Sequence, residues 1–282
     1  MTAPSSFGER VRGAIETFGP LCVGIDPHRA LLEGWGLEDS AAGAREFGLR
    51  VVEASAGAVG IVKPQVSFFE RHGSAGFAAL EEVIAAARAA GLLVIADAKR
   101  GDIGSTMDAY AEAWLRPGSP LEADAMTASP FLGVGALKST FALAEASGKG
   151  VFVLAATSNP EASAAQGAVL GGRRTLSAAI IAEVSGRNAL VTPESEWAST
   201  GFVIGATVDW DRAGLAAFAP PAPILAPGFG HQGAGPADLP LRFGELARCV
   251  IASESRSILE AGPTRLGAVI KARVSEYRGI RA

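Results

Sequence analysis

The sequence has few of the residue types that metal and redox sites require. It contains two cysteines, Cys22 and Cys249, and three histidines, His28, His72 and His231, and no two of the histidines are spaced as metal ligands. This scarcity argues against a zinc or di-metal hydrolase. Both cysteines lie in apolar runs and are expected to be reduced core residues of an intracellular protein, with a buried pair between them as the alternative.

Other absences narrow the class of protein further. No apolar run approaches the roughly 18 to 20 residues that span a bilayer, and the amino terminus lacks the apolar core of a secretory signal, so we expect a cytoplasmic protein. The formal net charge of −4 gives no reason to expect a nucleic acid or an acidic membrane as partner. A serine-hydrolase G-x-S-x-G motif is missing, and "GFGHQGA" does not follow the dinucleotide-binding fingerprint.

Short apolar runs recur along the whole chain with helix-like segments between them. Each run is too short for a helix and too uniformly apolar for a strand with one wet face, which favours parallel strands covered on both sides. Eight such strands alternating with helices predict a single (β/α)8-barrel domain over residues 1–282, with a doubly wound open sheet as the alternative. The predicted strands are 21–26, 58–63, 92–99, 123–129, 151–157, 202–207, 222–228 and 249–253.

Two segments between the strands carry clear helical marks. Residues 74–91 have the periodicity of an amphipathic helix, with Ser74 as the expected cap and Gly91 as the residue that ends it. A second helix is expected to start with Ser105 or Thr106 as its cap.

Polar side chains gather where the predicted strands end. The stretch "IADAKRGDIGST" (95–106) closes the third strand with Asp97, Lys99 and Asp102, and strand alternation places Asp97 and Lys99 on the same side. Because the carboxyl ends of barrel strands form the active face, these charges are candidate catalytic groups; the alternative is an ion pair that holds a loop. The other candidates are Asp26 after the first strand, Lys63 after the second, and Thr157, Ser158 and Asn159 after the fifth.

The loops after the last two strands indicate phosphate binding. Gly228, Gly230 and Gly233 allow backbone amides to approach an anion closely, while Gln232 can donate from its amide and Arg256 offers a planar fork for phosphate oxygens. Barrel enzymes commonly hold phosphates in these loops. An ordinary flexible turn is the alternative for the glycine-rich loop.

These residues, in this order, resemble the orotidine 5′-phosphate decarboxylase family. "DAKRGDIGST" is similar to that family's D-x-K-x-x-D-I-x-x-T motif, and the "KPQ" block and the chain length resemble its longer bacterial branch. The resemblance implies a (β/α)8 enzyme of pyrimidine synthesis that converts orotidine 5′-phosphate to uridine 5′-phosphate and CO2 as a homodimer, without metal or organic cofactor. The other matching blocks are "GIDP" (24–27), "VKPQVSFFE" (62–70), "TSNP" (157–160), "APGFGHQGA" (226–234) and "SRSI" (255–258).

The resemblance also implies a role for each matching residue. Lys63, Asp97, Lys99 and the neighbouring subunit's Asp102 would form an array of alternating charge, in which Lys99 protonates a carbanion at C6 of the pyrimidine. The implied substrate contacts are Asp26, Lys63 and the partner subunit's Thr106 for the ribose, Ser158 and Asn159 for the pyrimidine, and Gln232, Arg256 and amides near Gly230 for the phosphate.

Two positions depart from the family pattern, and one segment has two interpretations. His231 stands where a small residue is expected, and Glu254 is acidic near an anion site, so it is expected to point away or to pair with a base. The Gly/Ala-rich segment 161–174 is either a mobile lid over the substrate or a disordered surface loop.

Two other functions are compatible with such a barrel. One is a magnesium-dependent sugar-phosphate enzyme, which is disfavoured because Lys63 stands where an acidic metal ligand would be needed. The other is a protein that binds a phosphate ligand and has lost catalysis, which is disfavoured because every charged member of the array is present.

Overall fold

The computed structural model describes residues 5–281, so residues 1–4 and 282 of the predicted domain lie outside the described part of the chain. Eight parallel strands close into a barrel in the order β1-β10-β9-β8-β5-β4-β3-β2. The eight predicted strands and the barrel are confirmed, and the open sheet is not. The strands are β1 (Leu21–Ile25), β2 (Ile61–Pro64), β3 (Leu93–Arg100), β4 (Ala125–Ala128), β5 (Gly150–Ala156), β8 (Thr200–Ile204), β9 (Ile224–Pro227) and β10 (Val250–Glu254).

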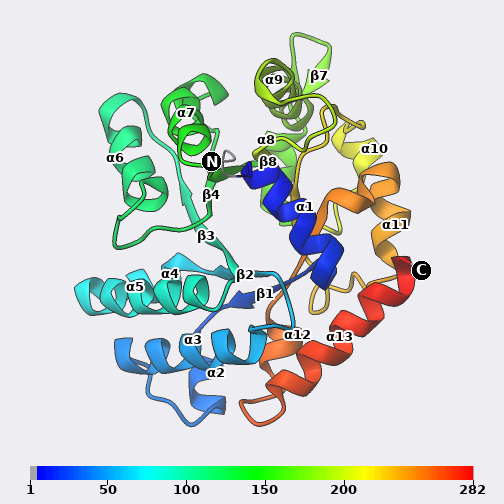
Figure 1. Cartoon of the computed structure of the whole chain (residues 1–282). Coiled ribbons are helices and arrows are strands. Elements are labelled where there is room, and N and C mark those ends of the chain that lie inside the picture. The colour runs from blue at the N-terminus through cyan, green and yellow to red at the C-terminus, as the bar shows by residue number, and fades with distance from the viewer. Residues whose placement is uncertain (1–4, 282) are drawn as a thin grey trace.

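Helices surround this barrel (Figure 1). They are α1 (Phe7–Phe18), α2 (Arg29–Gly34), α3 (Ala41–Ser55), α4 (Val66–Glu70), α5 (Gly73–Ala89), α6 (Gly104–Leu115), α7 (Lys138–Ala146), α8 (Ser163–Gln166), α9 (Leu176–Val191), α10 (Trp210–Ala213), α11 (Asp238–Phe243), α12 (Arg256–Leu259) and α13 (Leu266–Arg281). Three 3-10 helices, η1 (Val134–Leu137), η2 (Pro160–Ala162) and η3 (Gly244–Cys249), and a two-stranded hairpin of β6 (Val169–Leu170) and β7 (Arg174–Thr175) complete it.

Strand residues alternate between two apolar cores. Val62 and Val94 belong to the cluster that strands share with the surrounding helices, whereas their neighbours Ile61 and Ile95 belong to a separate cluster with Phe152 inside the barrel. Because the strands are buried on both faces, their sequences are almost uniformly apolar. Both cysteines are buried and reduced, as predicted.

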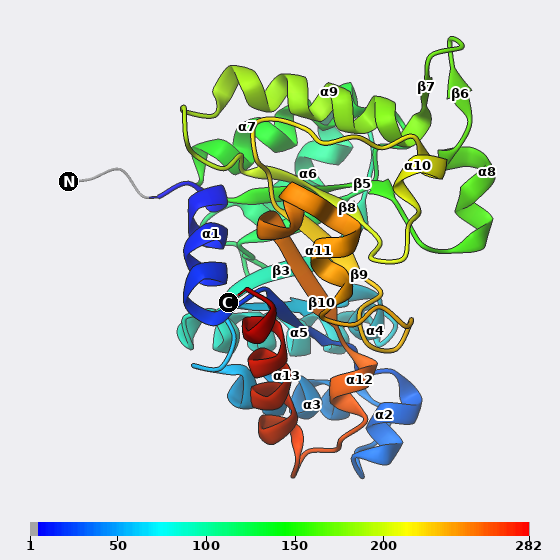
Figure 2. The same ribbon diagram turned by 90° about the vertical axis from the view of Figure 1, so that its right-hand side faces the viewer.

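Helix α1 covers the amino-terminal end of the barrel. Its Phe7, Val11 and Ile15 are buried in the inner cluster, and Phe7 meets Phe152 edge to face at 5.9 Å between ring centroids. Figure 2 shows α1 on one side of the molecule and α8 with the β6–β7 hairpin on the other. The helix therefore closes the end of the barrel opposite to the carboxyl ends of the strands.

The predicted caps of two helices were wrong. Helix α5 begins at Gly73, whose φ of +63° turns the chain directly out of α4, so Ser74 lies inside the helix and caps nothing. Gly91, with φ +77°, follows the end of α5 as predicted.

Helix α6 also begins earlier than predicted. It starts at Gly104, so neither Ser105 nor Thr106 caps it. The turn before it is held instead by Asp102, whose Oδ1 accepts a hydrogen bond of 2.8 Å from the amide of Ile103.

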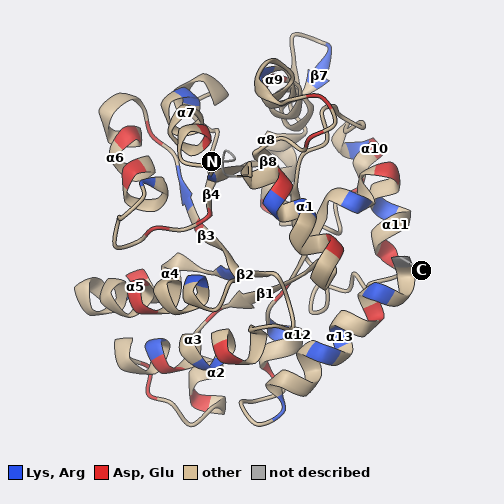
Figure 3. Ribbon diagram, viewed as in Figure 1, with Lys and Arg blue, Asp and Glu red and all other residues tan. Residues whose placement is uncertain are grey.

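Charges of both signs are interspersed along the outer helices (Figure 3), in keeping with the net charge of −4. Among residues 5–281, no helix combines the length and the apolar character needed to cross a membrane.

Candidate active site

A cavity of about 400 Å³ opens at the carboxyl ends of the barrel strands. Its walls come from the ends of β1, β2 and β3 and from the loops that follow β5, β9 and β10. The predicted site residues in this wall are Asp26, Lys63, Asp97, Lys99, Ser158, Asn159, Gln232 and Arg256, whereas Asp102, Thr106 and Gly230 are not among the residues that line it.

Asp97 stands between two lysines. Its Oδ2 is 3.1 Å from Lys63 Nζ, and its Oδ1 is 2.6 Å from Lys99 Nζ. The Lys63 and Asp97 side chains are only 6% and 10% exposed, whereas that of Lys99 is 47% exposed. A fixed, buried ion pair thus holds a lysine that reaches into the cavity.

The ion pairs determine the protonation states of the buried groups. Burial disfavours the charge of Lys63, but Asp97 and Asp26 outweigh it and hold the pKa of Lys63 above its usual value. Burial likewise disfavours the charge of Asp97, but Lys63 and Lys99 outweigh it and hold the pKa of Asp97 below its usual range. Both groups are therefore charged at neutral pH.

The backbone at Lys99 is strained. Lys99 has φ +48°, and the pairing of β3 with β4 shifts register between Ala96 and Arg100. A left-handed conformation costs a residue other than glycine about 1 kcal/mol or more. Such strain, at a position where a charged side chain is aimed into a cavity, is typical of functional sites.

Thr127 on β4 holds this strained segment and was not predicted from the sequence. Its fully buried hydroxyl donates to Asp97 Oδ1 at 2.9 Å and accepts from the Lys99 amide at 2.9 Å. Thr127 is the one polar residue in the strand "AMTA", and this was the only signal that could have identified it.

Gln65 is a second residue that was not predicted. Its Nε2 donates to the Asp97 carbonyl at 3.3 Å, and its Oε1 lies 3.5 Å from Lys99 Nζ. Gln65 follows Lys63 by two positions, so strand alternation places both side chains on one face, and this spacing was the available signal.

Asp26 presents an unsatisfied acceptor at the cavity. Its Oδ1 is buried and has no hydrogen-bond partner among the described residues. A buried carboxylate oxygen without a partner is costly, so this atom is suited to accept a hydrogen bond from a hydroxyl group of a bound ligand.

The loop after β9 meets the start of α12 at the other side of the cavity. Arg256 Nη1 lies 3.0 Å from His231 Nε2, and because a guanidinium only donates, His231 accepts through this nitrogen. Ser158 Oγ donates to Gln232 Oε1 at 3.0 Å, which joins the loop after β5 to this one. Gly230 has φ +75°, and its amide donates a hydrogen bond of 2.7 Å to the carbonyl of Ala234.

The segment 161–174 contains regular secondary structure and is bonded to the cavity wall. It folds into the end of η2, helix α8 and the β6–β7 hairpin. Gln166 accepts from the Thr157 amide and donates to Thr157 Oγ1, both at 2.9 Å, and Thr157 Oγ1 donates to Asn159 Oδ1 at 2.7 Å. This network connects the segment to two neighbours of Ser158.

Glu254 pairs with a base, as predicted. It is fully buried at the end of β10, and its Oε2 lies 3.3 Å from Arg273 Nε on α13. Glu254 does not line the cavity that Arg256 lines, and Arg273 offsets its charge.

Asp102 and Thr106 do not reach the cavity of their own chain. Asp102 lies in the turn between β3 and α6, and Thr106 is exposed on the first turn of α6. Neither residue is part of the array within its own chain.

The donor set does not resemble a metal centre. Within the described part of the chain, no group of three His, Cys, Asp or Glu residues is placed to hold a metal ion. The end of β2, where a magnesium-dependent relative would need an acid, carries Lys63.

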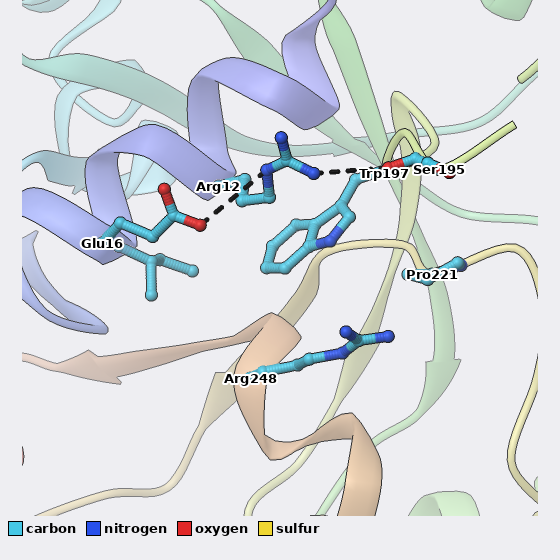
Figure 4. A pocket seen from close by; sticks show the side chains of 7 residues that line it. Arg12, Glu16, Ser195, Trp197, Pro221 and Arg248 are labelled. Atoms are coloured by element: carbon cyan, nitrogen blue, oxygen red, sulfur yellow. Dashed lines mark hydrogen bonds and ion pairs between the residues drawn. The ribbon is translucent and has the colours of Figure 1, made fainter. Parts of the chain in front are cut away.

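A second cavity, of about 390 Å³, lies at the amino-terminal end of the barrel (Figure 4). It is formed by α1 and by residues that precede β8, β9 and β10, among them Trp197 and Arg248. Arg12 at its edge is bound by Glu16 and by the carbonyl of Ser195. Within residues 5–281, its lining includes none of the predicted site residues, so the chemistry belongs to the first cavity.

Known proteins resemble the chain over most of its length. The family model described as "Orotidine 5'-phosphate decarboxylase / HUMPS family" matches residues 19–268. An orotidine 5′-phosphate decarboxylase of Salinispora arenicola is 52% identical over 258 residues, which cover 92% of this chain and 91% of the relative.

Solved structures resemble the fold closely. A crystal structure from Streptomyces avermitilis has a TM-score of 0.93 and 48% identity, covering 100% of this chain and 98% of its own. The structure of an OMP decarboxylase of Leishmania donovani has a TM-score of 0.80 and 31% identity, with 98% and 99% of the two chains covered.

Proposed function

The chain belongs to the orotidine 5′-phosphate decarboxylase / HUMPS family, and we infer that it converts orotidine 5′-phosphate to uridine 5′-phosphate and CO2 in pyrimidine biosynthesis. The observation that carries this function is the array in which Asp97 lies 3.1 Å from Lys63 and 2.6 Å from Lys99. The array places a cation, fixed in advance, beside the space where the substrate would react.

The reaction needs such a cation. When the bond from C6 to the carboxylate breaks, its electron pair stays on C6, CO2 leaves, and the resulting carbanion has no ordinary electron sink. The Lys99 ammonium stabilises this charge and donates a proton to C6. Because Asp97 holds Lys99 in place before the reaction, little reorganisation is needed as the negative charge develops.

The cavity offers a contact for each part of the substrate. Asp26 and Lys63 bind the ribose hydroxyls, which supplies the buried Asp26 Oδ1 with its missing partner. Ser158 and Asn159 contact the pyrimidine edge. The phosphate binds at Gln232 and Arg256, helped by backbone amides that follow Gly230, because the Gly230 amide itself bonds Ala234.

A homodimer completes the site. Asp102 does not line its own cavity. The turn that carries it begins beside Ser129, whose amide donates to the Arg100 carbonyl at 2.8 Å, and Phe131 and Leu132 follow Ser129 closely in the chain. Ile103 in the turn, Phe131 and Leu132 are 62%, 88% and 52% exposed. Such an exposed apolar patch fits a second copy of the chain. Packing of two copies here would bring the partner subunit's Asp102 and the partner's Thr106 to Lys99 and the ribose.

The segment 161–174 acts as a lid in this proposal. A cavity of about 550 Å³ lies between residues 156–167 and the segment 207–213 that follows β8, and Gln166 hydrogen-bonds to Thr157 in its wall. Closure of the lid would expel water from the reacting carbon and use binding energy from the distant phosphate.

We propose that residues 1–282 act as one domain, in the cytoplasm and without a cofactor. All eight barrel strands belong to one closed sheet, which supports a single domain.

The test is the ultraviolet absorbance of orotidine 5′-phosphate mixed with purified protein and EDTA. Prompt conversion to uridine 5′-phosphate is expected. Failure to convert it, with fold and dimer intact, would reject the proposal, and conversion of sugar phosphates that depends on magnesium would establish the alternative.

A further inference from the structure

The two phosphate-binding segments share a buried support beneath the cavity. Glu254 is fully buried at the end of β10, and its carboxylate receives three donors from the part of the chain that follows it. Ser257 Oγ donates to Oε2 at 2.7 Å, Tyr277 OH donates to Oε1 at 2.7 Å, and Arg273 Nε lies 3.3 Å from Oε2. A buried carboxylate is tolerated when its lone pairs are satisfied in this way.

This carboxylate touches the glycine-rich loop directly. A Cβ placed on Gly230 would lie 2.8 Å from Glu254 Oε2 and closer still to Ser257, so the loop backbone rests on the Glu254–Ser257 pair. Ser257 follows Arg256 in the sequence, and both residues lie on α12. One carboxylate therefore sets the position of the glycine-rich loop and of the helix that carries Arg256.

Helix α13 also contacts this loop, through the ring of Tyr277. The ring of Tyr277 meets Phe229 edge to face at 6.0 Å between centroids, and both side chains are almost fully buried. Burial and the Glu254 charge raise the pKa of Tyr277, so its hydroxyl remains a donor. Tyr277 thus holds Phe229 with its ring and Glu254 with its hydroxyl.

We propose that Glu254, Tyr277 and Arg273 form a positioning network that aligns the glycine-rich loop with Arg256 for the substrate phosphate. The inference rests on the phosphate site of the proposed function. The three residues touch no substrate. They fix the geometry of the groups that do, and Arg273 offsets a negative charge that would otherwise lie beneath the phosphate.

The test compares two substrates, orotidine 5′-phosphate and orotidine, which lacks the phosphate. Tyr277→Phe keeps the ring against Phe229 and removes only the hydroxyl. It is expected to lower kcat/KM for orotidine 5′-phosphate about tenfold, mainly through KM, since a hydrogen bond to a charged group is lost. For orotidine, kcat/KM is expected to be unchanged. Glu254→Gln should give a larger loss with the same selectivity.

Controls separate the network from the rest of the enzyme. Arg278→Gln alters the neighbouring residue of α13, which donates to the Thr17 carbonyl, and should leave both substrates unaffected. Equal losses for both substrates in Tyr277→Phe, or no loss in either, would overturn the network. If Arg256→Ala also fails to discriminate between the substrates, the phosphate site itself is wrong.

Discussion

Lys99 Nζ lies 2.6 Å from Asp97 Oδ1, although Lys99 adopts a left-handed backbone conformation with φ +48°. The backbone strain and the ion pair therefore occur at the same residue. The turned backbone lies within β3, where its pairing with β4 shifts register, and the ammonium lies beside the carboxylate at the cavity wall. The hydroxyl of Thr127 bonds both residues and maintains this arrangement.

Replacing Lys99 by alanine should nearly abolish decarboxylation. The variant loses the proton donor and the fixed cation together, so we expect kcat to fall by about 10³-fold or more. The measurement is loss of orotidine 5′-phosphate absorbance, with circular dichroism to confirm the fold. Arg100→Gln is the matched control, because the adjacent Arg100 pairs with Glu70 outside the cavity. Turnover close to wild type in Lys99→Ala would remove Lys99 from the mechanism.

Mixing two inactive variants should restore activity if Asp102 acts across a dimer. Lys99→Ala and Asp102→Ala subunits, unfolded and refolded together, would form heterodimers in which one site keeps both residues. Statistical pairing predicts about a quarter of wild-type activity in the mixture. Each variant refolded alone provides the baseline. A mixture no more active than its parts would show that Asp102 is not supplied by a partner.

A charge in the exposed patch should separate the subunits. Phe131→Glu places a carboxylate on a side chain that is 88% exposed, and burying that charge in a dimer interface is unfavourable. Sedimentation should give a monomer with little activity. Leu241→Glu, at a residue that is 81% exposed on α11, is the control and should leave the dimer intact. A dimeric and active Phe131→Glu would exclude this surface.

Glu122 should stabilise the fold in a pH-dependent manner. Burial disfavours its charge, but hydrogen bonds from Lys149 and from the Gly118 amide outweigh it and lower the pKa of Glu122 from 4.5 to about 2. Since the folded pKa is depressed, the contribution is complete above the unfolded value and is lost as the pH falls through the folded one.

Glu122→Gln should therefore lower the free energy of unfolding by about 2 kcal/mol at pH 7, measured by urea denaturation. The difference from wild type should shrink between pH 4.5 and pH 2. Glu112→Gln, which removes an exposed pair with Arg116, is the control and should cost less than about 1 kcal/mol. A difference independent of pH would contradict the assignment.

The barrel was predictable because burial on both faces leaves a strong pattern. Runs such as the one that became β5 are apolar throughout, and this uniformity identified all eight strands. The starts of α5 and α6 were not predictable, because backbone turns at Gly73 and Gly104 begin these helices before any side chain could cap them.

Within the site, charge at the end of a strand was the signal for residues that lie together. Lys63, Asp97 and Lys99 were identified in this way, and the structure brings them together. Thr127 and Gln65 were missed because a neutral residue inside or beside a strand gives a weaker signal than a charged one: its polarity in Thr127, and its spacing from Lys63 in Gln65. The partners of Glu254 were also hidden, since Arg273 and Tyr277 lie about twenty residues later and only the packing of α13 reveals them.

The closure of one barrel end by α1 affects how substrate enters and products leave the enzyme. Because Phe7, Val11 and Ile15 fill the amino-terminal end of the barrel, the described residues leave the opposite rim, where the cavity opens, as the route for substrate and products. CO2 and uridine 5′-phosphate would then leave by the route through which orotidine 5′-phosphate entered. A lid that opens slowly would delay the exit of both products. Product release, and not cleavage of the bond from C6 to the carboxylate, would then limit the turnover rate.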